Sequence, residues 1–598
     1  MTRAFRGLAD IEALERTAYE HAIPERTTYG LIARAAGLHP GRAAFVYLPD
    51  GEPATPSVRV SYAELLANIH RAANLFRSLG VGPDDAVAIL APNIPATQYA
   101  LWGAQVAGRA CPINFMLQPG HVTALLDASR AKVVVVLGPD AEVPGLGDRA
   151  LLRIGAGFEA ALQAQPHALQ FDPRLAPDRI AALFHTGGTT GAPKLVRHTH
   201  GNEAHSAWFA HLFYGFDETA VEVNGFPLFH VAGAFVYGLA SLAVGATQVL
   251  PTVTGMRNTA FLRNYWKFCE REGVTALACV PTILASLCNV PVDADISRVR
   301  VAYTGGSPLP SELAARFERT TGIPVRNILG MTECAGLVSI EPAAAARVPG
   351  SAGLRLPYTQ VRVVPWRGGR AQLEASCAAG ETGVLVLRGP HVSPGYTEAA
   401  RDAGMFEQGW LVSGDLGHLD AQGYVHVTGR AKDVIIRGSH NIDPGLVEDA
   451  FLAHPAVAMC AVVAEPDAHS GEVPAAFVTL KPGAQVEPAA LLAAVAPTVY
   501  EPPAVPKRVV VLDALPLTAV GKVYKPALRL AAIELKLQEV LAAVAPGTGL
   551  CVTVREQGAS VVASIAIASA EDAALQNRLL HALGAIAVPV EFRFTGRR

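Results

Sequence analysis

A run of glycine and hydroxyl residues directly after an apolar strand constrains this chain more than any other feature. The run is Thr186–Lys194, and the strand candidate before it is Ala181–Phe184. Glycines let the backbone approach a phosphate closely, while threonine hydroxyls and one lysine supply donors and positive charge. No Gly-Lys-Ser/Thr sequence closes the run, so it is not a Walker A loop. We therefore expect a phosphate-binding loop at the end of a strand, in preference to a plain surface turn.

Strand and helix patterns alternate on both sides of this loop. A capping-box spacing, Ser61 with Glu64, predicts the start of a helix over Leu65–Leu79. Such alternation is typical of an α/β fold with a largely parallel sheet covered by helices, in which ligands lie at the carboxyl ends of the strands. Short apolar runs predict the strands 86–90, 133–137, 180–184, 276–280 and 299–303.

The second part of the chain changes character after about Gly383. Patterns at 384–388 and 424–428 predict strands, and a mixed α and β unit then begins near Gly429. The length of 598 residues requires several domains, because one hydrophobic core rarely grows beyond about 250–300 residues. A long amphipathic helix over 527–544 is followed by strand, strand, helix and strand patterns. We expect this last part to be separable, so that a chain truncated after Ala545 still folds.

Composition excludes some classes of protein. The net charge is −3 with no run of Lys or Arg, which argues against a nucleic-acid binder. Eight scattered cysteines without a CxxC pair favour a reduced, cytoplasmic protein. The uncharged stretch Val223–Met256 is long enough to cross a bilayer, but its prolines and glycines favour a buried loop, a helix at about 232–243 and a strand at 247–250.

Three further motifs offer chemistry that matches a phosphate loop. Thr332 and Glu333 follow a strand pattern and offer a hydroxyl for phosphate and a carboxylate for Mg²⁺. Asp415 can accept both hydroxyls of a ribose, and Arg430 can bind phosphate or ribose. Lys522 lies in a glycine-bearing loop near the end of the second unit. Each motif alone is also compatible with an ordinary turn or a solvated side chain.

The ordered set of motifs from about Ser61 to Leu528 resembles the adenylate-forming superfamily, which includes acyl-CoA synthetases, luciferases and peptide-synthetase adenylation domains. The resemblance implies a large N-terminal domain of helix-covered mixed sheets with a β-barrel-like subdomain, a small mobile α+β C-terminal domain, and a site between them. We expect the boundaries 1–430 for the first domain, 431–545 for the second and 546–598 for a β-β-α-β extension. ATP, Mg²⁺ and coenzyme A are the implied cofactors.

The resemblance also implies a role for individual residues. Lys522 would be the catalytic lysine that bridges substrate carboxylate and α-phosphate, Thr332 would contact that phosphate and Glu333 would bind Mg²⁺. Lys432 would be the hinge of the small domain, Asp415 and Arg430 would hold the ribose, and Asn327 would contact adenine. The remaining assignments are phosphate contacts by Thr186, Gly187, Gly188, Thr189, Thr190 and Lys194, the adenine side by Gly305, Gly306 and Ser307, the thiol tunnel by Gly438 and Ser439, and the acid pocket by His230, Val231, Gly233 and Pro281.

Departures from the family pattern concern adenine and the thiol. Leu329 stands where an aromatic residue commonly stacks on adenine, and Ser439 stands where a glycine often lines the thiol tunnel. A separate cluster, His198, His200 and His205 with His185 nearby, invites a metal-site hypothesis, but its spacing fits no standard zinc pattern.

Three functions remain open on sequence alone. The favoured one is an acyl-CoA ligase for a fatty or other apolar acid, because the segment Phe229–Gly233 lacks the aspartate that amino-acid activators carry. The second is an adenylating enzyme that loads a separate carrier protein, and the third is a non-catalytic nucleotide-binding relative. The expected partners are a small carboxylic acid, ATP and CoA, with no nucleic acid and no integral membrane segment. The sequence leaves the acid and the oligomeric state open.

Overall fold

Two paired strands bracket the glycine-rich loop in the computed structural model of the chain. Strand β7 (Ile180–Thr186) and strand β8 (Lys194–Thr199) are antiparallel, with Thr186 opposite Lys194. The structure describes residues 4–186, 194–307, 309–437, 440–499, 502–518, 521–546, 550–557, 560–567, 573–583 and 588–594. These divide into a first unit, 4–186, 194–413 and 417–427, and a second unit, 414–416 and the described residues from 428 onward.

The loop belongs to a six-stranded sheet of the first unit, in which β7 and β8 form the antiparallel edge. Its strand order is β6-β5-β3-β4-β7-β8, and the other pairs are parallel. Alternate residues of each inner strand enter different cores, because successive side chains point to opposite faces. The other strands are β3 (Ala86–Leu90), β4 (Arg109–Pro112), β5 (Ala131–Leu137) and β6 (Ala150–Ile154).

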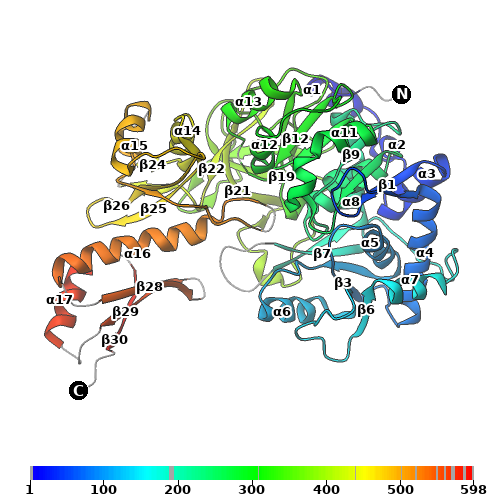
Figure 1. Ribbon diagram of the computed structural model, residues 1–598, viewed down its shortest axis with the longest axis horizontal. Coiled ribbons are helices and arrows are strands. Elements are labelled where there is room, and N and C mark those ends of the chain that lie inside the picture. Colours follow the sequence, from blue (N-terminus) through cyan, green and yellow to red (C-terminus); the bar gives the residue numbers. More distant parts are fainter. Residues whose placement is uncertain are drawn as a thin grey trace. The chain divides into compact units, whose positions relative to one another are not determined.

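Helices cover both faces of this sheet. Val87 and Ile89 of β3 share a core with α4 (Tyr62–Ser78) and α5 (Pro95–Ala107), whereas Ala88 and Leu90 pack with α6 (Pro119–Ser129) on the other face. Figure 1 shows α5 beside β7 and β3, with α6 below them. The expected capping box is present, because Ser61 and Glu64 cap the first turn of α4 reciprocally.

A nine-stranded mixed sheet forms the rest of the first unit's centre. Its order is β15-β14-β13-β12-β11-β9-β10-β1-β2. Helix α8 (His200–Tyr214) packs in the core on one face, and α10 to α13 pack on the other. The bounds are β1 (Ala43–Leu48), β2 (Val58–Ser61), β9 (Val221–Val223), β10 (Thr247–Pro251), β11 (Ala276–Cys279), β12 (Val301–Gly305), β13 (Val325–Leu329), β14 (Ser339–Ile340), β15 (Leu354–Arg355), α10 (Thr259–Arg263), α11 (Tyr265–Glu272), α12 (Pro281–Leu287) and α13 (Ser311–Thr321).

The uncharged stretch Val223–Met256 is buried inside this unit. It forms a π-helix, η1 (Ala232–Leu239), which continues into α9 (Ala240–Leu242) and then into β10. The expected loop, helix and strand are therefore present, although the first two turns are wider than an α-helix. Among the described residues, no helix combines the length and apolarity that a membrane crossing requires.

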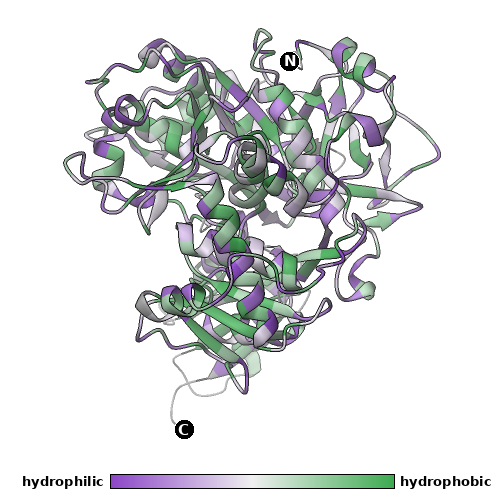
Figure 2. Cartoon of the chain, turned by 90° about the vertical axis from the view of Figure 1, so that its right-hand side faces the viewer, coloured by the Kyte–Doolittle hydropathy of each residue, from purple (hydrophilic) through white to green (hydrophobic). Residues whose placement is uncertain are grey.

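A third sheet follows, and it is the half-barrel that the family resemblance implied. It joins β16 (Gln360–Val364), β19 (Gly383–Arg388), β21 (Trp410–Leu419) and β20 (Phe406–Glu407), with β22 (Val425–Arg430) on β21. Many strands in Figure 2 carry hydrophobic colours, and hydrophilic colours are prominent on loops and on parts of the helices. The fold class expected from the sequence is confirmed.

The second unit contains two separate sheets. Strands β24-β23-β26-β25 form the first, and β27 pairs with β26. A three-stranded sheet, β28-β29-β30, forms the second. The bounds are β23 (Ile435–Arg437), β24 (His440–Ile442), α14 (Pro444–Leu452), β25 (Val457–Asp467), β26 (Gly471–Leu480), α15 (Pro488–Val495), β27 (Arg508–Val511), α16 (Lys525–Val544), β28 (Leu550–Gln557), β29 (Ser560–Ile567), α17 (Ala573–Leu583) and β30 (Val590–Phe594).

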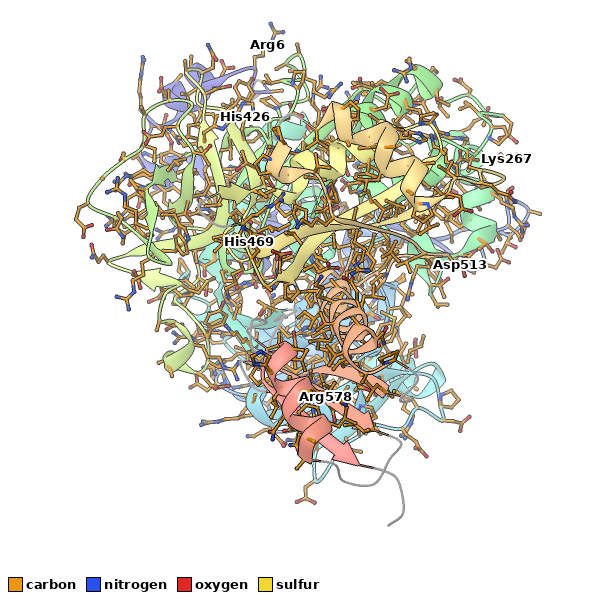
Figure 3. The ribbon with its side chains drawn as sticks, turned by 90° about the vertical axis from the view of Figure 1, so that its left-hand side faces the viewer. Arg6, Lys267, His426, His469, Asp513 and Arg578 are labelled. Carbon is orange, nitrogen blue, oxygen red and sulfur yellow. The ribbon has the colours of Figure 1, made fainter. Side chains whose placement is uncertain are left out.

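Helix α16 belongs to the cores of both sheets. Leu528 and Ala532 pack against strands β25 and β26, while Leu537 and Leu541 pack with β28, β29 and α17. Figure 1 shows α16 running between the two sheets, and Arg578, labelled in Figure 3, marks the exposed side of α17. The expectation of a separable extension therefore needs revision, because a cut after Ala545 passes through a shared core.

We expect removal of the residues after Ala545 to destabilise the second unit. Ile533, Leu537 and Leu541 would lose their cover, and burial of each such side chain contributes roughly 1.5–3 kcal/mol. The truncated chain should unfold at a lower temperature or aggregate, as measured by calorimetry and size-exclusion chromatography. A matched truncation with Ile533→Gln, Leu537→Gln and Leu541→Gln should recover solubility. An unchanged unfolding temperature of the unmodified truncation would contradict a shared core.

Candidate functional site

The ends of the phosphate loop are fixed by backbone pairing in the first unit. Thr186 ends β7 and Lys194 begins β8, directly opposite each other. The Lys194 ammonium lies 5.2 Å from the centre of the Tyr396 ring, a cation–π distance. The predicted contacts Gly187, Gly188, Thr189 and Thr190 lie outside the described residues. Thr186 and Lys194 thus offer a hydroxyl and a cation at the mouth of the loop.

The Thr332–Glu333 turn is a sharp reversal after β13. Residues Thr332–Cys334 form a single 3₁₀ turn, and Ala335 adopts a positive φ of 50°. A Cβ on Gly330 would overlap the carbonyl oxygen of Gly336, so only glycine fits there. The sequence therefore closes this turn tightly and presents its hydroxyl and carboxylate together.

Glu333 is buried and is held by one hydrogen bond to its carboxylate. The hydroxyl of Tyr396 donates to Glu333 Oε1 over 2.6 Å. Burial, followed by the neighbouring Glu333 charge, raises the pKa of the Tyr396 phenol, which keeps it a donor. Within the described part of the chain, Glu333 forms no salt bridge. Such a carboxylate suits Mg²⁺, which takes one or two protein carboxylates and completes its shell with phosphate and water. Glu333 therefore fits the expected metal ligand.

The backbone next to Glu333 is also anchored. Ring atom Nε2 of His198 lies 2.7 Å from the Thr332 carbonyl oxygen, and the Ser393 amide donates to the Glu333 carbonyl at 2.9 Å. His198 stacks on Phe184 at 5.2 Å, so its ring is fixed by the same strand that leads into the phosphate loop. Two functional loops are thus connected through one buried histidine that the sequence offered only as a metal-site candidate.

The remaining histidines of that cluster serve buried hydrogen bonds. Thr28 Oγ1 lies 2.9 Å from His200 Nδ1, and Tyr19 Oη lies 3.2 Å from His205 Nδ1. Glu203, on the same helix, accepts from the Gln105 amide at 2.9 Å. Burial lowers the pKa of His200 to about 3 and raises that of Glu203, which favours neutral forms of both. Within the described ranges, no group of three or more His, Cys, Asp or Glu side chains is arranged to hold a metal ion.

The predicted adenine side lies at the ends of two neighbouring parallel strands. Gly305 pairs with Ile328, and a Cβ on Gly305 would lie 2.7 Å from the Ile328 carbonyl oxygen. Gly306 has a φ of 87° and turns the chain toward Ser307. The Asn327 amide, however, donates to the Ser351 carbonyl at 3.0 Å, so it supports the strand end. The adenine contact of Asn327 stays a prediction.

The predicted acid pocket is built on the π-helix η1. His230 precedes it, and its Nδ1 accepts from the Ala232 amide at 3.1 Å. Val231 is buried, and a Cβ on Gly233 would lie 2.5 Å from the Pro227 carbonyl oxygen. Pro281 is buried at the first position of α12. π-Helical turns are rare and occur often at functional sites, and the acid-pocket role of these residues stays a prediction.

Two buried amides stabilise this unusual helix. Asn224 donates to the Gly233 carbonyl at 3.0 Å, and Gln248 donates to the Gly238 carbonyl at 2.8 Å. The two side chains also bond each other at 2.9 Å. Backbone carbonyls at a π-turn need such donors, because buried polar groups without a partner are costly. The sequence pattern did not indicate this role, since both residues look like ordinary strand positions.

An aromatic group lies next to the pocket segment. Phe229 stacks on His185 at 6.1 Å and meets Phe115 edge-on at 5.9 Å. The amide of Asn114 donates to His185 Nε2 at 3.1 Å, and burial lowers the pKa of His185 to about 4. His185 is therefore a neutral ring next to Thr186. Its edge accepts a hydrogen bond, and its face packs against Phe229.

In the second unit, Asp415 and Arg430 form an ion pair with each other, and the ribose contacts expected of both residues stay a prediction. Arg430 Nε lies 3.1 Å from Asp415 Oδ1, and Asp415 is buried while Arg430 is largely exposed. A buried carboxylate held by an arginine is preorganised to accept hydroxyls. The backbone between them is pinned, because the Ala431 amide donates to the Gly414 carbonyl at 2.9 Å.

The charges of Arg430 and Asp415 also affect the Lys522 ammonium. Burial, and next the positive Arg430, lower the pKa of the Lys522 ammonium to about 8, while Asp415 acts in the opposite direction. Its backbone is held by a short turn in which the Thr518 amide donates to the Lys522 carbonyl at 2.7 Å. Perturbed lysines of this kind are common in active sites.

The expected hinge residue Lys432 is tied to helix α16. Arg529 donates to the Lys432 carbonyl at 3.1 Å and forms an ion pair with Asp433 at 3.1 Å. Sequence reasoning missed Arg529, because a lone arginine in an amphipathic helix resembles a solvated residue. Gly438 and Ser439, predicted for the thiol tunnel, lie outside the described residues.

Comparison with known proteins agrees with this geometry. Residues 32–397 match the family model described as AMP-binding enzyme, and 446–522 match AMP-binding enzyme C-terminal domain. The chain is 36% identical to marinolic acid–CoA ligase from Pseudoalteromonas sp. (strain SANK 73390), over 87% of this chain and 83% of that protein. It is 34% identical to feruloyl-CoA synthase from Amycolatopsis sp, over 79% and 93%. ATP-bound MatB from Rhodopseudomonas palustris superposes with a TM-score of 0.76 at 26% identity, over 85% and 99%.

The chain belongs to the AMP-binding enzyme family, in its branch of AMP-forming acyl-CoA synthetases. ATP, Mg²⁺ and coenzyme A are the cofactors of this branch, and small carboxylic acids are its other substrates. The phosphate-loop ends, the Glu333 turn and the Asp415–Arg430 pair give this membership a structural basis.

The low pKa of Lys522 gives a pH dependence for the first half-reaction. Only the protonated lysine can counter anionic charge, so kcat/KM for pyrophosphate exchange should fall as the pH rises through about 8. In Lys522→Arg the guanidinium stays charged, so this alkaline fall should disappear even if the absolute rate drops. Profiles from pH 6.5 to 9.5 on both proteins measure the difference. The same fall in both would assign it to another group.

Proposed function

We propose that this chain joins an apolar carboxylic acid to coenzyme A by way of an acyl-adenylate. The observation that carries the choice of acid is the buried segment from Phe229 to Leu242, which contains no Asp, Glu, Lys or Arg. The segment itself therefore offers no side-chain charge to pair with a charged substrate tail, and burying an unpaired charge is costly. The carboxylate of Glu222, which accepts from Ser241 of this segment, lies in the preceding strand β9. The free cysteines support a reducing, cytoplasmic location as part of this proposal.

The first half-reaction demands control of negative charge. A carboxylate oxygen attacks the α-phosphorus of ATP, the bond to the bridging oxygen breaks, and pyrophosphate leaves. Lys522 would lie against the carboxylate and α-phosphate, and Lys194 against the outer phosphates, so that two anions can approach. Glu333 would hold Mg²⁺, which neutralises phosphate charge when bound. Asp415 and Arg430 would fix the ribose.

The second half-reaction needs less electrostatic help. The thiol sulfur attacks the carbonyl carbon of the mixed anhydride, its proton passes to solvent, and AMP leaves with the bonding electrons. The anhydride is already activated, so the cation that served adenylation is not required in the same place. Lys522 should therefore matter in one half-reaction and not in the other.

An acid panel tests the substrate proposal. Pyrophosphate release should be fastest with acids whose tails are uncharged, straight-chain or aromatic, and slow with matched acids that end in a second carboxylate or an ammonium group. Adding CoA should convert the adenylate to a thioester, which liquid chromatography detects. Preference for a charged tail would contradict the apolar pocket, and adenylation without CoA turnover would favour a carrier-protein acceptor.

The variant Lys522→Ala tests whether Lys522 acts in the adenylation half-reaction alone. Acyl-AMP formation should fall by about two to three orders of magnitude, which is the range for loss of one transition-state electrostatic contact. The same variant given synthetic acyl-AMP and CoA should form thioester at a rate near that of the wild type. Equal losses in both half-reactions would make Lys522 a structural residue.

A further inference from the structure

Tyr396 touches both charged groups that the first unit would offer to ATP. Its hydroxyl lies 2.6 Å from Glu333 Oε1, and its ring centre lies 5.2 Å from Lys194 Nζ. Glu333 and Lys194 come from different motifs that are far apart in the sequence. One side chain therefore links the predicted metal ligand with the predicted phosphate cation.

The backbone of Tyr396 is attached to the strand that begins with Lys194. Tyr396 forms an antiparallel bridge with Val196, and the Thr397 amide donates to the Leu195 carbonyl at 2.9 Å. The segment around Tyr396 therefore acts as a short extra strand along β8. Because β8 also carries Lys194, the tyrosine ring and the ammonium share one frame.

Contacts on its other sides hold Tyr396 in place. Its amide donates to Asp402 Oδ1 at 2.8 Å, and its ring meets Phe406 edge-on at 5.8 Å. Ring and backbone are thus both fixed, so the hydroxyl has a defined direction. Among the residues that the structure describes, Glu333 Oε2 has no hydrogen-bond donor, whereas Oε1 is taken by the phenol.

We propose that Tyr396 is a positioning residue that orients the Glu333 carboxylate for Mg²⁺ and the Lys194 ammonium for phosphate. An ionised carboxylate only accepts hydrogen bonds, so the phenol donates, and this charge-assisted bond fixes a terminal torsion that is otherwise broad. Oε1 is then directed by the phenol, and Oε2 is left for a cation. The ring face independently orients Lys194. The proposal rests on the metal and phosphate roles proposed above for Glu333 and Lys194.

Two substitutions separate the two contacts. Tyr396→Phe keeps the ring and removes the hydroxyl, whereas Tyr396→Leu removes both. Metal binding is measured directly as Mn²⁺ affinity by electron paramagnetic resonance, with saturating α,β-methylene-ATP and the acid absent. The affinity for the same nucleotide without metal is measured by calorimetry.

Tyr396→Phe should weaken Mn²⁺ binding about tenfold, because a hydrogen bond to a charged group is lost, and leave metal-free nucleotide affinity unchanged. Tyr396→Leu should weaken Mn²⁺ binding as much and also weaken the metal-free affinity about threefold, through loss of the cation–π contact. Tyr62→Phe is the matched control, since Tyr62 donates a hydrogen bond of the same 2.6 Å length to the Ala246 carbonyl. It should leave both affinities unchanged.

Failure of the positioning role and failure of the metal assignment are distinguishable. Wild-type Mn²⁺ affinity in folded Tyr396→Phe, checked by circular dichroism, would overturn the proposal. Glu333→Gln in the same assay tests the underlying assignment: if it loses metal while Tyr396→Phe does not, only the positioning role of Tyr396 fails. If Glu333→Gln keeps wild-type metal affinity, the metal assignment itself fails, and with it the basis for Tyr396.

Discussion

The antiparallel pairing of β7 with β8 is the constraint on which the candidate site of the first unit depends. It sets Thr186 opposite Lys194 and so fixes both ends of the phosphate loop. The same two strands place His198 on the Thr332 carbonyl and Tyr396 along β8. The ladder thus sets the positions of the hydroxyl and the ammonium at the two ends of the loop, which is the positioning that phosphate recognition requires.

The titratable groups of the candidate site residues lie beside neutral partners or beside a partner of opposite charge. As far as the described residues extend, Glu333 accepts a hydrogen bond from a neutral phenol and pairs with no cation, which leaves its charge available to a metal. Burial lowers the pKa of His185, so this ring adds polarity without adding charge next to Thr186, and burial lowers the pKa of His200 at the start of α8 in the same way. In the second unit, Arg430 satisfies Asp415 and at the same time makes a proton on Lys522 easier to lose.

Much of the fold was predictable because its strands and helices carry strong periodic patterns. The strands at 86–90, 133–137 and 180–184 are present within a few residues, and so is the capping box at Ser61. The π-helix was not predictable, because its wide turns depend on Asn224, which follows β9, and Gln248 of β10, and both residues lie outside the helix itself. The hydrophobic periodicity of a segment indicates its own secondary structure, but it does not indicate which side chains from other segments will hydrogen-bond to its backbone.

The candidate site was partly predictable for the same reason. Motif residues such as Glu333 and Asp415 stand out by type and spacing, whereas Tyr396 and Arg529 matter only through partners that the fold brings to them. Asn327 shows the converse, because a polar residue in a motif position donates its amide to the backbone of Ser351.

The sharing of α16 between two cores has an evolutionary consequence. Ile533, Leu537 and Leu541 are buried in the core that α16 shares with the extension. A lineage that lost the extension would be under selection to replace these three residues with polar ones, and a lineage that gained it would need the reverse changes. Apolar or polar residues at these three positions of α16 in a homologous sequence should therefore indicate whether that protein carries a C-terminal extension.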